Sequence, residues 1–275
     1  MKRIVVPVDF SPYSENAFLS AAKIAAKGDA TITCVNVITS ELDWKNLSEK
    51  EKTKYQEVLD LEAEAKDKLK SFIMTHKVKS TPIEAVVEVG VPNQVLAELA
   101  EKQKADLIVI GAYGKGYEEG KFIGSTTQKV MRNANCPVLA VKKVLDGRAM
   151  KKMVFASLFN EASKPAFTRM KPLIKNTGAS VYFLFVNTPS KFTDSDKAEE
   201  QMRKYAMGQE DLIIHRHIFN HEDAEKGIVA FAEKEKAGII GIASNVRKTN
   251  ASYQIGVTDT VLFKTDIPVL SVKFE

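Results

Sequence analysis

The stretch DLIVIGAYGKGYEEGKFIGSTTQKVMRNANCPVLAV (residues 106–141) decides the fold. Residues 107–110 form a short, apolar and mostly β-branched run that Gly111 ends, and such a run predicts a buried parallel strand. Residues 137–141, PVLAV, predict a second buried strand. The segment between them starts as a loop and continues into a helical pattern through Val130 and Met131. The stretch therefore predicts a strand, a loop, a helix and a strand in that order.

The loop before the predicted helix is rich in glycine, and three hydroxyl residues open the helix. Glycine lets a loop approach a ligand closely because it has no Cβ. The free N–H groups and the dipole of a helix N-terminus both favour an anion. Together these features predict an anion-binding site. The residues concerned are Gly111, Gly114, Gly116, Gly120 and Gly124 in the loop, and Ser125, Thr126 and Thr127 at the helix start.

The glycines follow the spacing G-x2-G-x9-G-[ST], from Gly111 through Gly114 to Gly124 and Ser125. This spacing is not a Walker P-loop, because no Gly-Lys-[Ser/Thr] closes it. It is not a dinucleotide fingerprint either, because Gly120 falls one residue too far and the loop follows a late strand. An ordinary glycine-rich surface loop is the alternative that the spacing alone leaves open.

Length and composition restrict the class of protein. The 275 residues are enough for two α/β domains, and 44% hydrophobic with 27% charged residues favours packed cores over disorder. The net charge of +5, from 40 basic and 35 acidic residues, is too small to indicate nucleic-acid binding. No apolar run is long enough to span a membrane, and the N-terminus lacks the pattern of a signal peptide. Because the two cysteines, Cys34 and Cys136, also lie in predicted strand surroundings, we expect a cytoplasmic protein.

The first half alternates predicted strands and helices, which is typical of a doubly wound parallel sheet. The first strand ends at Asp9, and ligands of such sheets bind beyond the carboxyl ends of strands. Ser11 is placed to cap the next helix, with Pro12 at its first position. A long charged helix is expected from about Glu49 to Ile73, with apolar residues at three-four spacing. Further strands are expected at 31–37 and 83–89, and a further helix from Pro92.

Four segments of this half resemble the universal stress protein family. They are VPVDFSPYSENA at 6–17, GVP at 90–92, ADLIVIG at 105–111 and NCPVLAV at 135–141. The glycine spacing also resembles the ATP-binding signature of that family, and the match covers residues 1 to about 143. The resemblance implies a Rossmann-like parallel sheet in the strand order 3-2-1-4-5, with ATP and magnesium as the ligand.

The resemblance also implies roles for individual residues. Asp9 would accept the amino group of adenine, and the backbone at Val37 would meet the adenine edge. Gly111 and Gly114 would pass close to the ribose and phosphates, and residues 124–127 would donate to the phosphates. On turn chemistry alone, a helix-capping or turn aspartate is the alternative for Asp9. The expected nucleotide site comprises Pro7, Val8, Asp9, Val37, Ile110, Gly111, Gly114, Gly124, Ser125, Thr126 and Thr127.

The second half repeats the first. KRIVVPVDFSPYSENAF at 2–18 aligns without a gap with KKMVFASLFNEASKPAF at 151–167, and CPVLAV at 136–141 aligns with IPVLSV at 267–272. We therefore expect two tandem domains, 1–145 and 146–275, joined by a linker at 143–150. The core pattern survives in the copy, but the site does not. Leu158 stands opposite Asp9, Val257 stands opposite Ser125, and the loop at 247–255 contains no glycine.

The two domains are expected to pair through their final strands, as universal stress proteins do, so that the chain forms a pseudo-dimer. Leu139 and Val141 would then meet Leu270 and Val272. Paired edges hide backbone groups that would otherwise invite aggregation. Association of two chains into a homodimer stays open.

Some patterns carry less information. Trp44 and Tyr117 are candidates for stacking on adenine, although single aromatic residues usually cover apolar surface. Lys115 and Lys121 are candidates for the phosphate end of the site or for solvated residues of the loop. His215 and His217 share a strand face, but with His221 in the following loop they are too few to indicate zinc, so no metal residue is assigned.

The leading hypothesis is a cytoplasmic regulatory protein that binds ATP in its first domain alone. One alternative is a slow ATP hydrolase built on the same site. Glu118 and Glu119 are the general-base candidates in the loop, and both are expected to be solvated, so no catalytic residue is assigned. The other alternative is an interaction module whose loop binds no nucleotide.

Overall fold

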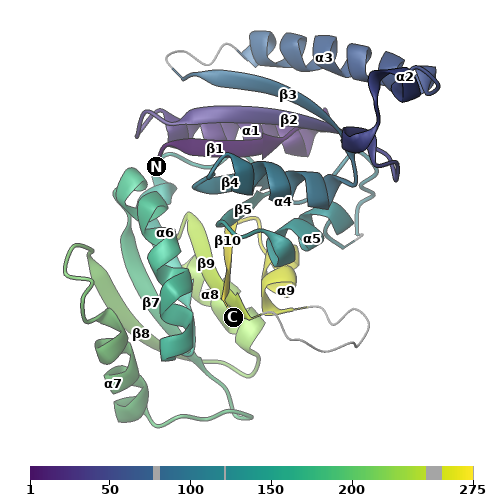
Figure 1. The fold of residues 1–275 in the computed structure, drawn as a ribbon. Coiled ribbons are helices and arrows are strands. Elements are labelled where there is room, and N and C mark those ends of the chain that lie inside the picture. Colours follow the sequence, from purple (N-terminus) through teal and green to yellow (C-terminus); the bar gives the residue numbers. More distant parts are fainter. Residues whose placement is uncertain (77–80, 121, 246–255, 275) are drawn as a thin grey trace.

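The computed structural model describes residues 1–76, 81–120, 122–245 and 256–274 (Figure 1). In this part of the chain, ten strands form one continuous sheet in the order β3-β2-β1-β4-β5-β10-β9-β6-β7-β8. Neighbouring strands are parallel except β5 and β10, which pair antiparallel. The predicted order 3-2-1-4-5 is thus confirmed in the first half, and the second half repeats it outward from β10. Lys121 and the expected glycine-free loop at 247–255 lie outside the described residues.

The first half places its helices and strands as follows. They are β1 (Arg3–Pro7), α1 (Pro12–Ala25), β2 (Thr31–Thr39), the 3-10 turn η1 (Trp44–Asn46), α2 (Glu49–Lys52), α3 (Gln56–His76), β3 (Ile83–Gly90), α4 (Pro92–Lys102), β4 (Leu107–Gly111), α5 (Ser125–Asn133) and β5 (Val138–Val141).

The second half follows the same succession with a shorter helix, α7, in place of α3. Its elements are η2 (Ala149–Lys151), β6 (Lys152–Ala156), η3 (Glu161–Ser163), α6 (Lys164–Thr177), β7 (Ser180–Asn187), α7 (Ser195–Ala206), β8 (Ile214–Asn220), α8 (Ala224–Lys234), β9 (Ile239–Asn245), α9 (Val257–Lys264) and β10 (Val269–Phe274).

A hydrophobic layer covers each face of the sheet. Helices α1, α3, α6 and α7 cover one face, where Phe18, Leu69 and Phe167 are buried. Helices α4, α5, α8 and α9 cover the other face, where Leu96 and Val261 are buried. Strands of the first half run across the view of Figure 1 and those of the second half run nearly upright, so the sheet twists strongly between them. Both layers extend through both halves, and the chain therefore folds around a shared pair of cores.

Helix starts in the first half follow the local sequence. Ser11 caps α1 by accepting a hydrogen bond from the N–H of Ser14, and Pro12 takes the first helical position. Pro92 likewise takes the first position of α4, and Ser125 is the first residue of α5. The polar loop after β4 is therefore delivered directly to the N-terminus of α5.

The expected continuous helix from Glu49 to Ile73 is wrong in one respect, because the chain breaks between α2 and α3. A capping box at Ser48 starts the short α2, and the hydroxyl of Thr53 donates to the carbonyl of Lys50 at its end. Lys52 also lies 5.8 Å from the ring of the buried Trp44. These local bonds favour a separate turn, which the three-four spacing of apolar residues does not reveal.

The final strands of the two halves pair at the centre of the sheet, as predicted. Leu139 faces Leu270, with Ala140 opposite Val269 and Val138 opposite Ser271. Val141 and Val272 lie outside these three paired positions, so their predicted contact across the axis is not part of the register. Each strand directly follows a proline (residues 137 and 268), and a residue without an N–H limits the ladder. The pseudo-dimer therefore rests on a short ladder whose paired residues are all buried.

The segment between β5 and β6 packs against the protein and does not hang free. Leu145 and Met150 are both buried in the same core layer as α1 and α6. The carboxylate of Asp146 accepts hydrogen bonds from the N–H groups of Arg148 and Ala149 and so fixes the turn. The linker therefore contributes to the contact between the halves.

The repeat extends to rare backbone conformations. Phe10 has a positive φ of 63°, and its counterpart Phe159 has one of 54°. Lys104 and its counterpart Lys236 have φ values of 50° and 53°. Residues other than glycine rarely adopt this left-handed conformation. Its occurrence at matching positions shows that the two halves share the backbone path at these turns and not only the strand order.

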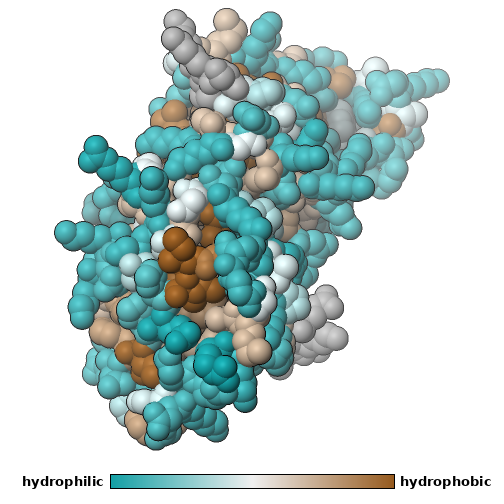
Figure 2. All heavy atoms as spheres, turned by 90° about the vertical axis from the view of Figure 1, so that its left-hand side faces the viewer, coloured by the Kyte–Doolittle hydropathy of each residue, from teal (hydrophilic) through white to brown (hydrophobic). Residues whose placement is uncertain are grey.

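The surface in Figure 2 is the face at the left of Figure 1. Hydrophilic residues cover most of it, and hydrophobic residues gather in a compact area near its middle. Within the described ranges, no helix combines the length and the apolar character needed to cross a membrane.

Candidate functional site

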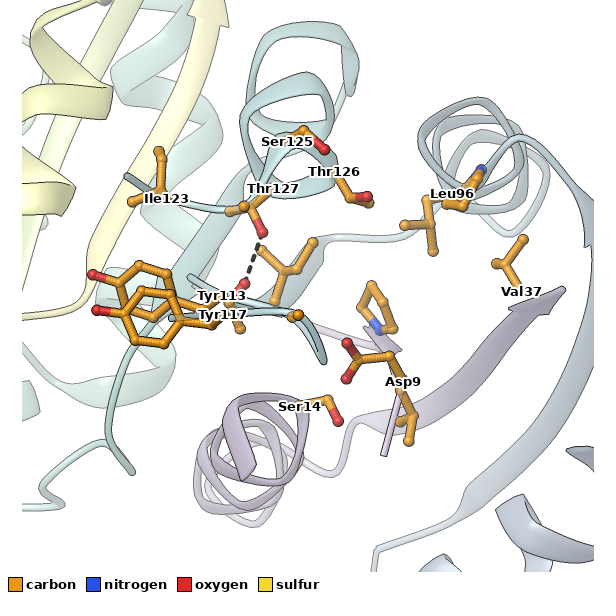
Figure 3. Close-up of a pocket in the computed structure, with 18 of the residues that line it drawn as sticks. Asp9, Ser14, Val37, Leu96, Tyr113, Tyr117, Ile123, Ser125, Thr126 and Thr127 are labelled. Carbon is orange, nitrogen blue, oxygen red and sulfur yellow. Dashed lines mark hydrogen bonds between the residues drawn. The ribbon is translucent and has the colours of Figure 1, made fainter. Parts of the chain in front are cut away.

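A cavity of about 520 Å³ opens at the carboxyl ends of β1, β2 and β4 in the first half (Figure 3). This volume lies within the range of small-molecule sites, roughly 300 to 1,000 Å³. Asp9 lies on one side of the cavity and the N-terminus of α5 on the other, while Val37 and Leu96 line one end. All eleven residues of the predicted nucleotide site line this one cavity: Pro7, Val8, Asp9, Val37, Ile110, Gly111, Gly114, Gly124, Ser125, Thr126 and Thr127.

Asp9 is fixed by the protein as well as directed into the cavity. Its Oδ1 accepts hydrogen bonds from the N–H of Ser11 at 3.0 Å and from the Ser11 hydroxyl at 2.6 Å. Its Oδ2 accepts one from the N–H of Lys115 at 2.9 Å. The alternative of a turn aspartate is therefore realised, and the same side chain also ties the glycine loop to the end of β1. A carboxylate has about four acceptor positions, so one remains at Oδ2 for a ligand.

The glycines of the loop are needed for different reasons. A Cβ on Gly111 would lie 2.8 Å from the backbone carbon of Tyr13, so helix α1 itself requires glycine there. A Cβ on Gly114 would lie 3.0 Å from Oδ2 of Asp9 and would crowd the acceptor. Gly124 meets nothing closer than 3.5 Å and has an ordinary φ of −60°. The packing around Gly124 does not demand glycine, although glycine is also favoured at the N-cap of a helix.

The first turn of α5 presents N–H groups to the cavity. The first four N–H groups of a helix have no partner within the helix. The N–H of Gly124, just before the helix, donates to the carbonyl of Ala112, and the intrahelical ladder begins with Gln128. The N–H groups of residues 125–127 are thus left directed at the cavity side of the helix.

The hydroxyl of Thr127 has a structural role that the resemblance does not imply. Thr127 is buried, and its Oγ1 donates to the carbonyl of Gly111 at 2.7 Å, marked by the dashed line in Figure 3. Its proton is therefore committed to β4 and not to a phosphate. Thr127 can therefore donate to a ligand only through its backbone N–H.

We expect Thr127→Val to lower the free energy of unfolding by about 1 to 3 kcal/mol, because the substitution removes a buried donor from the Gly111 carbonyl. Urea unfolding measures the effect. Thr126→Val is the matched control, since the Thr126 hydroxyl makes no hydrogen bond within the described residues, and its change should stay within about 0.5 kcal/mol. Equal stability of both variants would contradict the role assigned to Thr127.

An aromatic group borders the cavity at the end away from Val37. Tyr113 and Tyr117 stack with ring centroids 3.7 Å apart, and both line the cavity. Burial, followed by the adjoining Tyr117 hydroxyl, raises the pKa of Tyr113 above its ordinary value. The candidate Trp44 lies elsewhere, buried against Tyr55.

Several cavity residues were not predicted from the sequence. Leu96 follows the Gly-Val-Pro segment at the start of α4, and Phe122 with Ile123 directly precedes the last glycine of the spacing. An apolar residue in the first turns of that helix was a usable signal, because this helix starts at the same edge of the sheet. The candidates Lys115, Glu118 and Glu119 are all exposed and absent from the lining of the cavity.

The corresponding region of the second half is built differently. Asp259 stands in the position of Thr127, and its Oδ2 accepts a hydrogen bond from the N–H of Gly256 at 3.3 Å. The N-terminus of α9 is thus capped by a carboxylate of its own helix, which would repel a phosphate. A Cβ on Gly227 would lie 2.7 Å from Cγ1 of Val186, so α8 also approaches β7 very closely.

The histidines of β8 pack on an aromatic residue. His215 and His217 lie with ring centroids 4.8 and 5.3 Å from that of Tyr182. Nδ1 of His221 accepts a hydrogen bond from the N–H of Asp223. The rings of His215 and His217 thus pack on Tyr182, whereas His221 stabilises the turn before α8.

The family is decided by sequence comparison, and the model of the universal stress protein family matches residues 1–142. The chain belongs to the universal stress protein family. It is 37% identical over 150 residues to a universal stress protein of Methanocaldococcus jannaschii, covering 52% of this chain and 82% of that protein. It is 32% identical over 148 residues to a putative universal stress protein of Staphylococcus aureus, covering 51% of this chain and 84% of that protein.

The whole architecture also occurs in a solved universal stress protein. The crystal structure of a universal stress protein from Archaeoglobus fulgidus aligns with 98% of both chains at a TM-score of 0.70 and 19% identity. This likeness concerns the fold, including the second half that the family model does not match. The tandem arrangement of two universal-stress-protein-like halves is thus found in another member of the family.

Proposed function

We propose that this universal stress protein binds ATP, with magnesium, in the cavity of its first half and acts as a cytoplasmic regulatory protein in a stress response. The observation that carries the proposal is the cavity itself, which places the carboxylate of Asp9 opposite the N-terminus of α5. An acceptor for a base and donors for an anion at opposite sides of one cavity match the two ends of a nucleotide.

The adenine would lie at the end of the cavity formed by Val37 and Leu96. The remaining acceptor position on Oδ2 of Asp9 would receive the exocyclic amino group, while the backbone at Val37 would meet the edge of the ring. Apolar side chains at this end favour the flat face of a base over water. Asp9 needs no rearrangement for this role, because Ser11 and Lys115 already hold its carboxylate.

The phosphates would lie at the first turn of α5. The N–H groups of residues 125–127 and the hydroxyl of Ser125 supply donors, and the helix dipole favours the negative charge. Magnesium usually keeps several waters and binds through substrate phosphates with one or two carboxylates. In the cavity lining the carboxylate is that of Asp9, at the base end, so magnesium would enter on the phosphates of the nucleotide.

Isothermal titration calorimetry of the full chain with ATP and magnesium tests the proposal. We expect saturable binding of about one ATP per chain, because Asp259 occupies the corresponding helix N-terminus in the second half. If the titration shows no binding, the alternative of an interaction module that binds no nucleotide is favoured. Analysis of the nucleotide after hours of incubation with fresh ATP separates binding from slow hydrolysis: ADP beyond the amount of protein would make the chain a hydrolase.

Ser125→Ala should weaken ATP binding by about 1 to 2 kcal/mol, the usual scale for losing a hydrogen bond to a charged group. This corresponds to roughly a 5- to 30-fold rise in the dissociation constant. Ser125 is exposed at the start of α5, so the substitution should leave the fold intact. Ser125→Thr retains the hydroxyl and should retain most of the affinity. Wild-type affinity in the alanine variant would place the phosphates elsewhere.

A further inference from the structure

A wall of the cavity is supported by the second half of the chain. Phe122 lines the cavity, and its ring lies 5.0 Å from that of Phe263 on α9, at an interplanar angle of 38°. Phe263 itself is absent from the lining. The end of the glycine loop thus packs against a side chain from the other half of the protein.

Helix α5 is held by the same helix of the second half. Its N-terminus borders the cavity, and near its C-terminus Arg132 forms an ion pair with Asp259 at 2.6 Å between Nη2 and Oδ2. Asp259 is 3% exposed whereas the Arg132 side chain is 42% exposed, so losing this contact would leave a buried carboxylate without its cation, which is costly. Figure 1 shows α5 and α9 side by side. The helix that would bind the phosphates is therefore anchored across the seam between the halves.

A third contact joins α9 to the aromatic end of the cavity. Nζ of Lys142 donates to the carbonyl of Phe263 at 2.8 Å and lies 5.7 Å from the ring centroid of Tyr113. Carbonyls in the last turn of a helix lack intrahelical partners, so a lysine there is favourable. Three features of the cavity (the Phe122 loop, α5 and Tyr113) thus meet one short helix of the second half.

One of the residues that make these contacts stands where the repeat has lost its site. Asp259 stands in the position of Thr127, whereas Phe263 stands in the position of Met131, a core residue outside the cavity lining. In the first half, Thr127 holds α5 to β4 by its bond to Gly111. In the second half, the replacement reaches across the seam to Arg132 instead. At Asp259, the loss of the site hydroxyl from the copy therefore coincides with a new contact to the first half.

We propose that Asp259 and Phe263 of the second half are positioning residues for ligand binding in the first half, so that the nucleotide site is complete only when α9 is docked. The inference rests on the proposed function. Neither residue would touch the ligand; they hold α5 and the Phe122 loop in the geometry that the ligand requires. When the loop and helix are already ordered, the entropic cost of ligand binding is lower and the affinity is higher.

The test uses the full chain with Phe263→Ala and calorimetric titration with ATP and magnesium. Because the variant loses the contact between the rings of Phe122 and Phe263, we expect its dissociation constant for ATP to rise by about 3- to 10-fold. Phe192→Ala is the matched control, because Phe192 is 74% exposed in the second half and lies outside α9. Phe263→Tyr keeps the ring and should restore the affinity.

A second set of variants separates positioning from general damage. In a chain that carries Phe122→Ala, the further change Phe263→Ala should have little additional effect on ATP affinity, because both remove the same contact. Asp259→Asn, which keeps the shape of the side chain while removing its charge, should also weaken ATP binding. Since Phe263 is 37% exposed, its variants should stay folded, which circular dichroism checks.

The outcomes distinguish the two proposals. If the wild-type chain binds ATP and Phe263→Ala binds it as tightly as Phe192→Ala does, the positioning role is overturned while the proposed function stands. Additive effects of Phe122→Ala and Phe263→Ala would overturn it as well. If the wild-type chain binds no ATP, both proposals fail together.

Discussion

We expect Gly124→Val to abolish ATP binding while the chain remains folded. Gly124 caps α5 with φ −60° and ψ 137°, a conformation open to any residue. A Cβ there would meet its nearest neighbour, the carbonyl oxygen of Ala112, at an ordinary 3.5 Å. The branched side chain would instead occupy the cavity beside the first turn of α5, where phosphate oxygens have to approach the N–H groups. The loss of binding should therefore be close to complete.

The repeat supplies a control at the equivalent position. Gly256 caps α9 with φ −83°, and a Cβ there would lie 3.8 Å from Oδ2 of Asp259. Gly256→Val should bind ATP as the wild-type chain does, because no phosphate is expected at that helix. Calorimetric titration of both variants makes the comparison. Wild-type affinity in Gly124→Val would place the phosphates outside the first turn of α5.

We expect residues 1–145, expressed alone, to dimerise or aggregate. In the full chain, β5 is covered on its outer edge by β10, and Leu139 is fully buried opposite Leu270. Removing the second half would leave β5 as an edge strand with unpaired backbone groups and an apolar surface beside it. Pairing with another copy would satisfy those groups. The same contact is intramolecular in the full chain, where a short linker gives an effective concentration near millimolar.

Sedimentation of the fragment and of the full chain measures this effect. The full chain should keep its halves paired even as a monomer, although two chains are free to associate further. If the fragment is monomeric and binds ATP with normal affinity, the first half does not need the second half as a structural partner. That result would also conflict with the positioning role of Phe263, since the fragment lacks α9.

The positions of the strands and helix starts follow from local features of the sequence, whereas the strand order was implied by the resemblance to universal stress proteins. Apolar runs that end at Asp9 and Gly111 mark buried parallel strands, and prolines mark the starts of α1 and α4. The alignment of 136–141 with 267–272 identified the final strand of each half, and the resemblance to universal stress proteins implied that these strands, β5 and β10, pair. The strands and helix starts carry their own local signals, but the order and the pairing of the strands do not.

Features that depend on distant partners were beyond the sequence. Spacing indicated that Thr127 belongs to the site, but its hydroxyl faces the Gly111 carbonyl because β4 lies behind α5. The contact of Lys115 with Asp9 joins residues far apart in the chain, and so does the ion pair of Arg132 with Asp259. Such contacts follow from packing, which a pattern of residue types does not encode directly.

The crystal structure of the full chain soaked with ATP and magnesium tests the central claim most directly. It should show one nucleotide per chain, with the adenine between Val37 and Leu96, its amino group at Asp9, and phosphates at the first turn of α5. The N-terminus of α9 should carry no nucleotide, because Asp259 already caps it. A nucleotide bound at α9, or an empty first-half cavity at saturating ATP, would contradict the account.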